Sequence, residues 1–262
     1  MGFFDFNRAL VRAAPNSVVN GLQAVDAGAP SLAGVRAEQA AYVAALEAAG
    51  VQVEHLPALE DFPDSIFVED AALVFPHAAI VLRPGAPSRR GEAAAIAPAL
   101  GARFERVLTL RQGSVDGGDV LATPRGVFIG VSKRTSAEGA AALKRLLAEI
   151  GLEGRPVSTP SGVLHFKSDC ALLDEETVLA TPQLAASGVF DGFRLLVTPA
   201  GEEAAANAIR LGATVLISSA WPATGELLAS QGYDATPLAT AEIAKIDAGL
   251  SCMSLRWRSA PG

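Results

Sequence analysis

The sequence contains little cysteine and little histidine. It has two cysteines, Cys170 and Cys252, and three histidines among 262 residues. Two cysteines are too few for a disulfide framework or a cysteine-rich zinc site, so neither is expected. Three histidines also leave few candidates for a base that could assist a reactive thiol.

The sequence also lacks long apolar runs and an excess of basic residues. No run of 18 or more apolar residues occurs, so no transmembrane helix is expected. The formal net charge is −7, whereas nucleic acids and anionic membranes bind concentrated basic surfaces. Asp5 lies where a signal peptide would be apolar. We therefore expect a cytoplasmic protein that binds a small-molecule substrate, with no nucleic acid and no membrane as partners.

The composition is that of a globular protein. Half of the residues are hydrophobic, and glycine and proline occur throughout the chain. The length allows one large domain or two small ones. The segment 16–30, which ends in a stretch of alanine, glycine and proline, is expected to form a loop. A long loop near a terminus often acts as a mobile lid.

A pattern of strand, tight turn, strand, helix and strand recurs from Ser65 onward. A separate helix is expected between Ser31, its cap, and Gly50, its end. A fifth unit would be closed by the chain ends, because the apolar strand 250–257 can pair with the strand 9–12. The residues themselves do not repeat, so only the pattern does. The expected hairpins span 71–82, 120–131, 170–180 and 208–217.

Five polar residues lie at or just before these hairpins. Asp70, Asp119, His165, Asn207 and Cys252 follow one another at intervals of 49, 46, 42 and 45 positions. If the five units surround a pseudo-fivefold axis, these residues meet at its centre. The spacing therefore predicts that Cys252 and His165 are neighbours in space.

Cys252 lies on a turn of small residues before an apolar strand. A thiol attacks as the thiolate, so a catalytic cysteine needs a partner base and a local field that favours the anion. His165 is the histidine that lies in an apolar strand and precedes polar residues. The alternative is that Cys252 is a small buried hydrophobe, which is the more common fate of a single free cysteine.

Carboxylates flanked by apolar residues and glycine form a second pattern. Asp64, Asp70 and Asp116 each precede an expected hairpin. Such groups are costly to bury unless they face a cation. A guanidinium suits them because it is planar, always charged and rich in donors. Taken singly, each carboxylate is equally well explained as a loop or cap residue.

Two arginines form a third pattern. Arg89 and Arg134 stand at the expected starts of helices, where the helix dipole disfavours a cation. This placement is interpreted as a site for the carboxylate of a ligand. A solvated surface position is the alternative.

As a set, these motifs resemble the dimethylarginine dimethylaminohydrolase family, and the resemblance covers nearly the whole chain. It implies a single catalytic domain, 1–262, with an α/β fold, the five-bladed pseudo-fivefold α/β propeller, and a lid loop at about 16–30. It implies hydrolysis of Nω-methylated arginine, asymmetric dimethylarginine or monomethylarginine, to citrulline and dimethylamine or methylamine through a covalent cysteine thiouronium. The motifs that carry the resemblance are Phe62-Pro63-Asp64-Ser65-Ile66-Phe67-Val68-Glu69-Asp70, Arg83-Pro84-Gly85 with Ser88-Arg89-Arg90-Gly91-Glu92, Asp116-Gly117-Gly118-Asp119-Val120, Ser132-Lys133-Arg134-Thr135, Leu164-His165-Phe166-Lys167-Ser168, and Ile246-Asp247 with Ser251-Cys252-Met253-Ser254-Leu255-Arg256.

Carried over residue by residue, the resemblance assigns the reacting end of the site. Cys252 would be the nucleophile and His165 the general acid and base. Asp70 and Asp116 would hold the guanidinium, with Glu69 beside them. No metal or organic cofactor is implied, although a Cys–His pair predicts that Zn²⁺ competes with catalysis.

The resemblance also assigns the amino-acid end of the substrate. Arg89 and Arg134 would bind the α-carboxylate, and Asp64 with the backbone of Leu22 would bind the α-amino group. The backbone carbonyl of Ile246 would line the pocket. The sequence does not fix the oligomeric state, and a homodimer stays open.

Two alternative functions share part of this pattern. An arginine deiminase or an amidinotransferase would use the same cysteine, histidine and carboxylates, but those relatives are usually much longer. A non-catalytic arginine-binding protein would need the carboxylates and has no use for a thiol. The methylarginine hydrolase is therefore the favoured interpretation.

Overall fold

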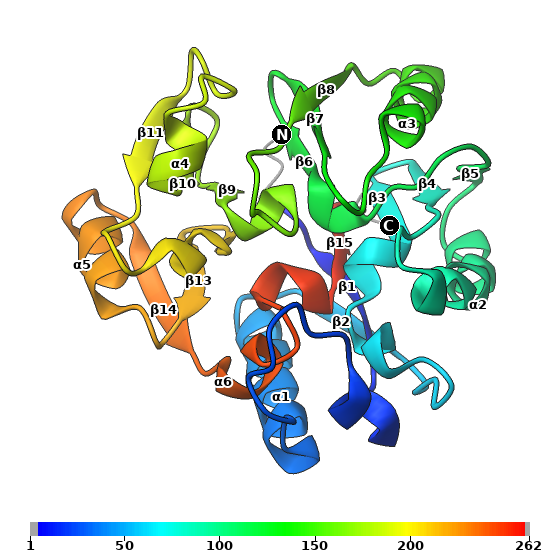
Figure 1. Ribbon diagram of the computed structural model, residues 1–262, viewed down its shortest axis with the longest axis horizontal. Helices are drawn as coiled ribbons and strands as arrows, with labels where there is room; N and C mark the ends of the chain where they lie inside the picture. Colours follow the sequence, from blue (N-terminus) through cyan, green and yellow to red (C-terminus); the bar gives the residue numbers. More distant parts are fainter. Residues whose placement is uncertain (1–4, 260–262) are drawn as a thin grey trace.

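The computed structural model of the protein describes residues 5–259, and within them the strands form five small sheets around one axis. Figure 1 looks along this axis, with the sheets arranged in a ring and the helices at its outside. Each sheet contains an antiparallel pair of strands and a third strand, which pairs parallel to one strand of that pair. The expected five-bladed α/β propeller is thereby confirmed.

The order of strands along the chain follows the repeated pattern. Four blades are built from consecutive strands, and the fifth combines the two ends of the described chain. The blades are β3(Ala72–Phe75), β4(Ala78–Val81) and β5(Arg106–Thr109); β6(Val120–Thr123), β7(Gly126–Val131) and β8(Gly154–Ser158); β9(Cys170–Leu172), β10(Thr177–Ala180) and β11(Arg194–Val197); β12(Ile209–Leu211), β13(Thr214–Ser218) and β14(Asp234–Leu238); and β15(Leu255–Trp257), β1(Arg8–Arg12) and β2(Gln52–Leu56).

A helix in each blade connects the two parallel strands, because such a connection must cross from one end of the sheet to the other. The first begins after Ser31, whose hydroxyl accepts a hydrogen bond from the Gly34 N–H at 3.2 Å. Gly50 follows its end with a positive φ of 83°, as the sequence predicts for a glycine in this place. The helices are α1(Leu32–Ala48), α2(Arg90–Gly101), α3(Ala137–Glu149), α4(Pro182–Ala185) and α5(Pro222–Ser230), and α6(Ala241–Ala244) follows the last blade strand before β15.

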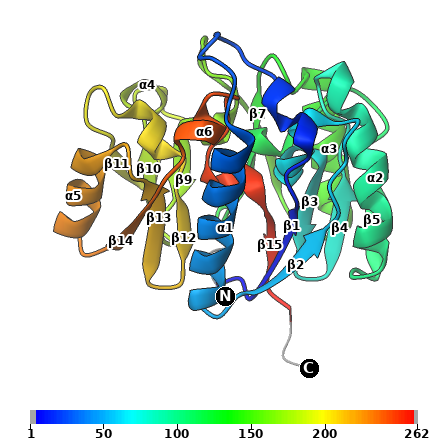
Figure 2. The same cartoon turned by 90° about the horizontal axis from the view of Figure 1, so that it is seen from below.

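Short 3₁₀ helices precede the first strand of each blade and gather at one end of the axis. The segment η3 contacts η5 and η8, while η6 contacts η5 and η7. Figure 2 shows this end at the top, with the start of β1 and the end of β15 on the opposite side. The five segments are η3(Val68–Ala71), η5(Gly117–Asp119), η6(Phe166–Ser168), η7(Glu203–Ala206) and η8(Leu250–Met253).

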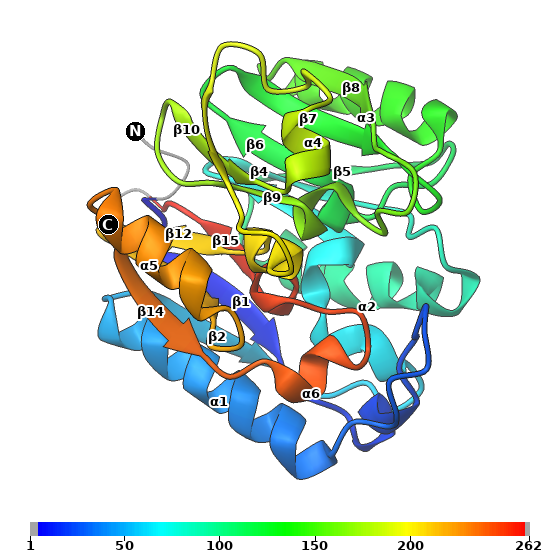
Figure 3. The same cartoon turned by 60° about the vertical axis from the view of Figure 1, so that its left-hand side comes forward.

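The closing blade corrects one expectation. β15 pairs antiparallel with β1, but it begins only at Leu255, so the expected strand 250–257 is too long. Residues 250–253 instead form η8, which turns the chain across the axis before the strand begins. Figure 3 shows this segment between α6 and β15. A turn of 3₁₀ helix places Cys252 at the end of the axis, where a continued strand would have carried it into the sheet.

No helix among the described residues is both long enough and apolar enough to span a membrane. The expected domain, 1–262, includes residues 1–4 and 260–262, which lie outside the described part of the chain. The single-domain interpretation stays a prediction.

Candidate active site

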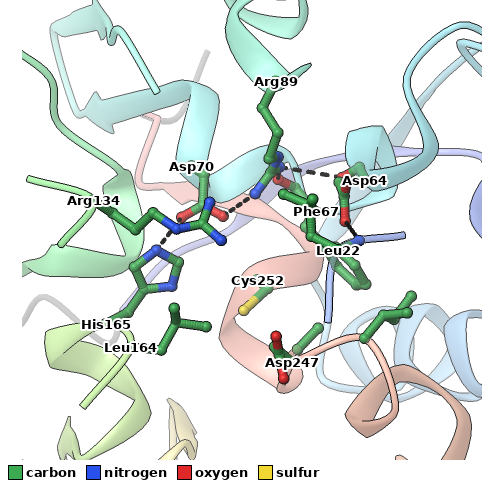
Figure 4. Close-up of a pocket in the computed structure, with 12 residues that line it drawn as sticks. Leu22, Asp64, Phe67, Asp70, Arg89, Arg134, Leu164, His165, Asp247 and Cys252 are labelled. Carbon is green, nitrogen blue, oxygen red and sulfur yellow. Dashed lines mark hydrogen bonds and ion pairs between the residues drawn. The ribbon is translucent and has the colours of Figure 1, made fainter. Parts of the chain in front are cut away.

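Cys252 lies at the centre of the η8 turn, where its side chain faces a small cavity. The residue is 9% exposed, and its N–H donates to the Gly249 carbonyl at 3.2 Å. His165, at the start of η6, lines the same cavity. Figure 4 shows the sulfur and the imidazole facing this space from two different blades. The pseudo-fivefold spacing therefore brings these two residues to one site.

Two carboxylates flank the imidazole of His165. Its Nε2 lies 2.9 Å from Asp116 Oδ2 and 4.0 Å from Asp70 Oδ1. Glycine allows this close approach, because a Cβ at Gly118 would lie 2.8 Å from His165 Nδ1 and 3.0 Å from Asp70 Oδ1. The Gly118 N–H also donates to Asp70 Oδ1 at 2.9 Å. Glycine before β6 is thus needed for the close contact with His165 and Asp70 as well as for the turn.

The surroundings of His165 and Cys252 favour the protonated form of both groups, so the pair does not hold a preformed thiolate. Burial alone would lower the pKa of His165, but the charge of Asp70, the hydrogen bond to Asp116 and the charge of Asp119 raise it to about 9. Burial, followed by the charges of Glu69 and Asp70, raises the pKa of the Cys252 thiol to about 12. Near neutral pH the site therefore holds an imidazolium and a neutral thiol.

Asp70 and Arg89 form a buried ion pair on the cavity wall. Burial opposes ionisation of Asp70, yet the charges of His165 and Arg89 lower its pKa to about 2. Arg89 Nε donates to Glu92 at 3.0 Å, and Nη2 donates to the Phe67 carbonyl at 2.8 Å. Most donors of this guanidinium are therefore already used, which differs from the free cation that the sequence predicted.

Arg134 is the less constrained arginine of the site. Its Nη1 lies 3.9 Å from Asp116 Oδ2, and its side chain is 19% exposed. Within residues 5–259 its guanidinium makes this one ion pair and no closer hydrogen bond. Arg134 is therefore the cation that keeps most donors available for a ligand.

The remaining predicted residues lie on the other side of the cavity. The Leu22 N–H donates to Asp64 Oδ1 at 2.9 Å, and both residues line the cavity together with Ile246. Figure 4 shows Leu22 and Asp64 on the side away from Arg134. The loop that contains Leu22 thus forms part of the wall.

The resemblance assigns Asp116 to the guanidinium and places Glu69 beside it. Neither lines the cavity. Asp116 is fully buried behind His165 and also accepts the Gly85 N–H at 2.7 Å. Glu69 faces along the axis, away from the cavity, because adjacent residues of a 3₁₀ turn point about 120° apart. Its Oε2 accepts the Ser251 hydroxyl at 3.1 Å.

Asp247 belongs to a motif of the resemblance but was given no role, and it also lines the cavity. It has a φ of 56°, the one positive value at a non-glycine residue in the described chain. Aspartate tolerates this conformation better than most residues. Its carboxylate accepts the Ala24 N–H at 2.5 Å and so holds the loop over the cavity. Other wall residues without a distinctive sequence signal are Phe67, Leu164 and Ala248.

The cavity itself has a volume of about 30 Å³. A single water needs roughly 10–15 Å³ on this measure, so an arginine side chain does not fit without movement. Asp70, Asp116 and His165 also present three ligand atoms within 4.8 Å of one another, a group that does not include Cys252. Inhibition by Zn²⁺ through the Cys–His pair stays a prediction.

Comparison with known proteins places this geometry in one family. No family model matches the chain. It is 36% identical over 256 residues to the N(G),N(G)-dimethylarginine dimethylaminohydrolase of Pseudomonas aeruginosa, covering 96% of this chain and all of the relative. The Streptomyces coelicolor enzyme of the same name is 36% identical over 83% of this chain and 84% of its own.

Solved structures agree with the sequence comparison. A mutant of the Pseudomonas aeruginosa enzyme in complex with citrulline superimposes with a TM-score of 0.93 and 36% identity, over 97% of this chain and 100% of that one. The substrate-bound N-terminal domain of the cyanobacterial arginine dihydrolase ArgZ gives 0.83 at 16% identity, over 96% and 98% of the two chains, which shows a shared fold. The chain belongs to the dimethylarginine dimethylaminohydrolase family.

Proposed function

We propose that the protein hydrolyses Nω-methylated arginine to citrulline and methylamine or dimethylamine through a covalent cysteine intermediate. The observation that carries this proposal is that Cys252, His165 and Asp70 line one and the same cavity. A thiol, an acid–base group and a guanidinium-binding carboxylate meet there. An arginine-binding protein without catalysis would need only the last of them.

Substrate binding uses the charges around the cavity. The guanidinium of the substrate lies on Asp70, and its α-carboxylate binds Arg134. The α-amino group binds Asp64 and the backbone carbonyl of Leu22. Arg89 already donates to Asp70, Glu92 and two carbonyls. It therefore holds Asp70 in place and offers at most one remaining N–H to the substrate carboxylate.

The substrate itself activates the nucleophile. The thiol of Cys252 is neutral in the free protein because burial and nearby carboxylates raise its pKa to about 12. A bound guanidinium places a positive charge beside the sulfur and so favours the thiolate. The thiol proton then leaves to solvent as the substrate binds.

The chemical steps follow from these protonation states. The thiolate attacks the guanidinium carbon and forms a C–S bond. His165, protonated near neutral pH, gives its proton to the departing amine as the C–N bond breaks, which leaves a thiouronium on Cys252. The neutral imidazole next takes a proton from water, and the hydroxide attacks the same carbon. The C–S bond breaks, and citrulline is released.

Asp116 and Glu69 support this chemistry without touching the substrate. Asp116 accepts a hydrogen bond from His165 Nε2 and so fixes the orientation of the ring. Glu69 binds the hydroxyl of Ser251, the residue before the nucleophile, and so holds η8 in place. We propose these positioning roles in place of the guanidinium contact that the resemblance implied for Asp116.

The loop 16–30 acts as the lid. Gln23 Nε2 donates to the Lys245 carbonyl at 2.7 Å, so the loop is held against the segment that precedes η8. The cavity of about 30 Å³ below it is too small for an amino acid, and the loop must therefore move for substrate to enter. The cytoplasmic location and a homodimer stay predictions.

The test is an assay of citrulline and amine with asymmetric dimethylarginine, monomethylarginine and arginine. Cys252→Ser should release no citrulline, whereas the matched control Cys170→Ser, which alters a cysteine of β9 outside the cavity, should retain activity. Ammonia and citrulline from plain arginine would instead indicate a deiminase. Arginine binding without any product would indicate a non-catalytic binding protein.

A further inference from the structure

A second and much larger cavity lies on the same axis, on the side of η8 that faces away from Cys252. Its volume is about 480 Å³, within the range of small-molecule sites. The inner strands of the five blades, β3, β6, β9, β12 and β15, form its wall. It runs from the 3₁₀ ring to the turn between β3 and β4, at the opposite end of the axis (Figure 2).

The wall of this channel is mainly apolar. The five inner strands direct alternate side chains toward the axis, as strand geometry requires. The resulting surface could cover an unbranched hydrocarbon chain on all sides. The apolar residues that line it include Leu73, Phe75, Leu121, Leu172, Ile209 and Trp257.

The inner end of the channel carries an excess of positive charge. Lys167 Nζ lies 2.6 Å from Glu69 Oε1, and Arg256 Nη2 lies 3.2 Å from the same oxygen. One carboxylate therefore serves two cations. The Lys167 and Arg256 side chains are 13% and 17% exposed, whereas that of Glu69 is 4% exposed. Both cationic side chains line the channel.

The outer part of the channel also has more positive than negative side chains. Arg210 and Arg258 line it, against the single carboxylate of Asp5. Within the described residues, the channel thus has four cationic side chains and two carboxylates. The whole chain has a formal net charge of −7. A local positive excess in an acidic protein, enclosed by apolar walls, is complementary to an anion with an apolar body.

We propose that the channel is a second binding site, for a small amphipathic carboxylate. The hydrocarbon part lies against the inner strands, and the carboxylate binds Lys167 and Arg256. This site is separate from the cavity of Cys252, because Glu69, Ser251 and η8 lie between the two.

A carboxylate bound in the channel should affect Cys252 at the catalytic end of the axis. Glu69 accepts the Ser251 hydroxyl at 3.1 Å, and Asn207 accepts the Ser251 N–H at 3.1 Å. A carboxylate bound to Lys167 and Arg256 competes with Glu69 for its two cations and so disturbs the support of η8. It also brings a negative charge toward Cys252, which disfavours the thiolate. Ligand in the channel should therefore lower kcat without raising KM.

Binding can be measured on a single tryptophan. The chain has two tryptophans, and Trp257 lines the channel whereas Trp221 does not. In a Trp221→Phe background, sodium octanoate should change the emission of Trp257 in a saturable way. Octyltrimethylammonium, with the same chain and the opposite charge, should not. This readout does not depend on catalytic activity, so it separates failure of this proposal from failure of the proposed function.

Two variants locate the ligand. Lys167→Met should weaken octanoate binding about tenfold, because it removes one charge-assisted contact. Lys144→Met, which alters an exposed lysine of α3, should leave the affinity unchanged. Ala122→Phe should block binding by filling the channel wall.

The proposal is overturned if the folded single-tryptophan protein shows no saturable response to octanoate. It is equally overturned if octyltrimethylammonium binds as well, because charge would then play no part. Inhibition that is purely competitive with methylarginine would place the carboxylate at Arg134 instead of in the channel. Because the titration uses the chain with its channel intact, a variant that fails to fold does not leave the question open.

Discussion

The two ends of the propeller axis are built from the same five repeats but have opposite character. At one end the 3₁₀ ring encloses a cavity of about 30 Å³ in which Asp64, Asp70 and Asp247 face the nucleophile. At the other end the inner strands enclose about 480 Å³ with mainly apolar walls and an excess of cations. The layer that contains Glu69 and Lys167 separates them. Apolar strands supply the scaffold, and the short turns before them supply the chemistry.

This division explains how an acidic protein can handle a substrate that has both charges. In the proposed function, carboxylates at the catalytic end bind the guanidinium of the substrate, and Arg134 with part of Arg89 is left for its carboxylate. The cations of the opposite end lie behind η8, where they balance Glu69. Variants that alter matched residues at the two ends should therefore differ in activity, stability and pH dependence.

The largest difference is expected between the histidines of the two ends. His165→Gln should lower kcat on the order of 10²–10⁴-fold, because the departing amine loses its proton donor. His77→Gln alters an exposed histidine at the channel end and should leave kcat unchanged. Steady-state citrulline release at saturating dimethylarginine measures both. A loss smaller than about fivefold in His165→Gln would remove the imidazole from the mechanism.

The separating layer is tested by a pair of glutamates. Glu69→Gln leaves Lys167 and Arg256 without their carboxylate and should lower the free energy of unfolding by about 3–5 kcal/mol. Glu149→Gln breaks a half-exposed pair with Arg106 and should cost about 0–1 kcal/mol. Urea unfolding at neutral pH compares the two. Equal losses would mean that the buried network contributes no more than a surface pair.

The arginines should differ in substrate affinity. Arg134→Gln removes the least occupied guanidinium of the site and should raise KM about 10- to 100-fold with a smaller change in kcat. Arg258→Gln, at the channel end, should leave KM unchanged. Initial rates over a range of dimethylarginine concentrations separate the two constants. An unchanged KM in Arg134→Gln would mean that Arg89, and not Arg134, binds the α-carboxylate of the substrate.

Much of the fold could be predicted from the sequence because the hairpins have apolar strands and distinct turns. The repeated pattern predicts a third strand in each unit, but the residues of the edge strands β8 and β14 were not identified. Each contains a proline, Pro156 or Pro237, and several exposed positions. An edge strand tolerates proline because one side of its backbone needs no partner, so the usual strand pattern is lost. Residues 154–158 and 234–238 are strands because they pair with β7 and β13, and such pairing depends on the tertiary structure.

The sequence predicted which residues belong to the candidate site better than how their side chains are arranged. Regular spacing brought Cys252 and His165 together, and acidic motifs indicated Asp64 and Asp70. The sequence could not show that Asp70 faces the cavity while its neighbour Glu69 faces the channel, since both lie in one short turn. Nor could it show that Arg89 is held by Glu92, because helix position alone does not reveal a buried partner.

The smallest predicted difference is the effect of pH on stability. The pKa of His165 is raised from 6.5 to about 9, so the folded state binds its proton more tightly than the unfolded state. The stability from this proton is fully present below pH 6.5 and is lost as the pH rises through about 9. Between pH 7 and pH 8 the free energy of unfolding should fall by about 1 kcal/mol.

The matched histidines again provide the control. His165→Gln should remove this decline, whereas His77→Gln should retain it, and urea unfolding at a series of pH values measures both. Asp70, whose charge contributes most to raising this pKa, is also the carboxylate proposed to bind the guanidinium, so one group would affect both catalysis and stability. A decline of equal slope in both variants would show that groups other than His165 release protons in this range, and the imidazolium at neutral pH would have to be abandoned.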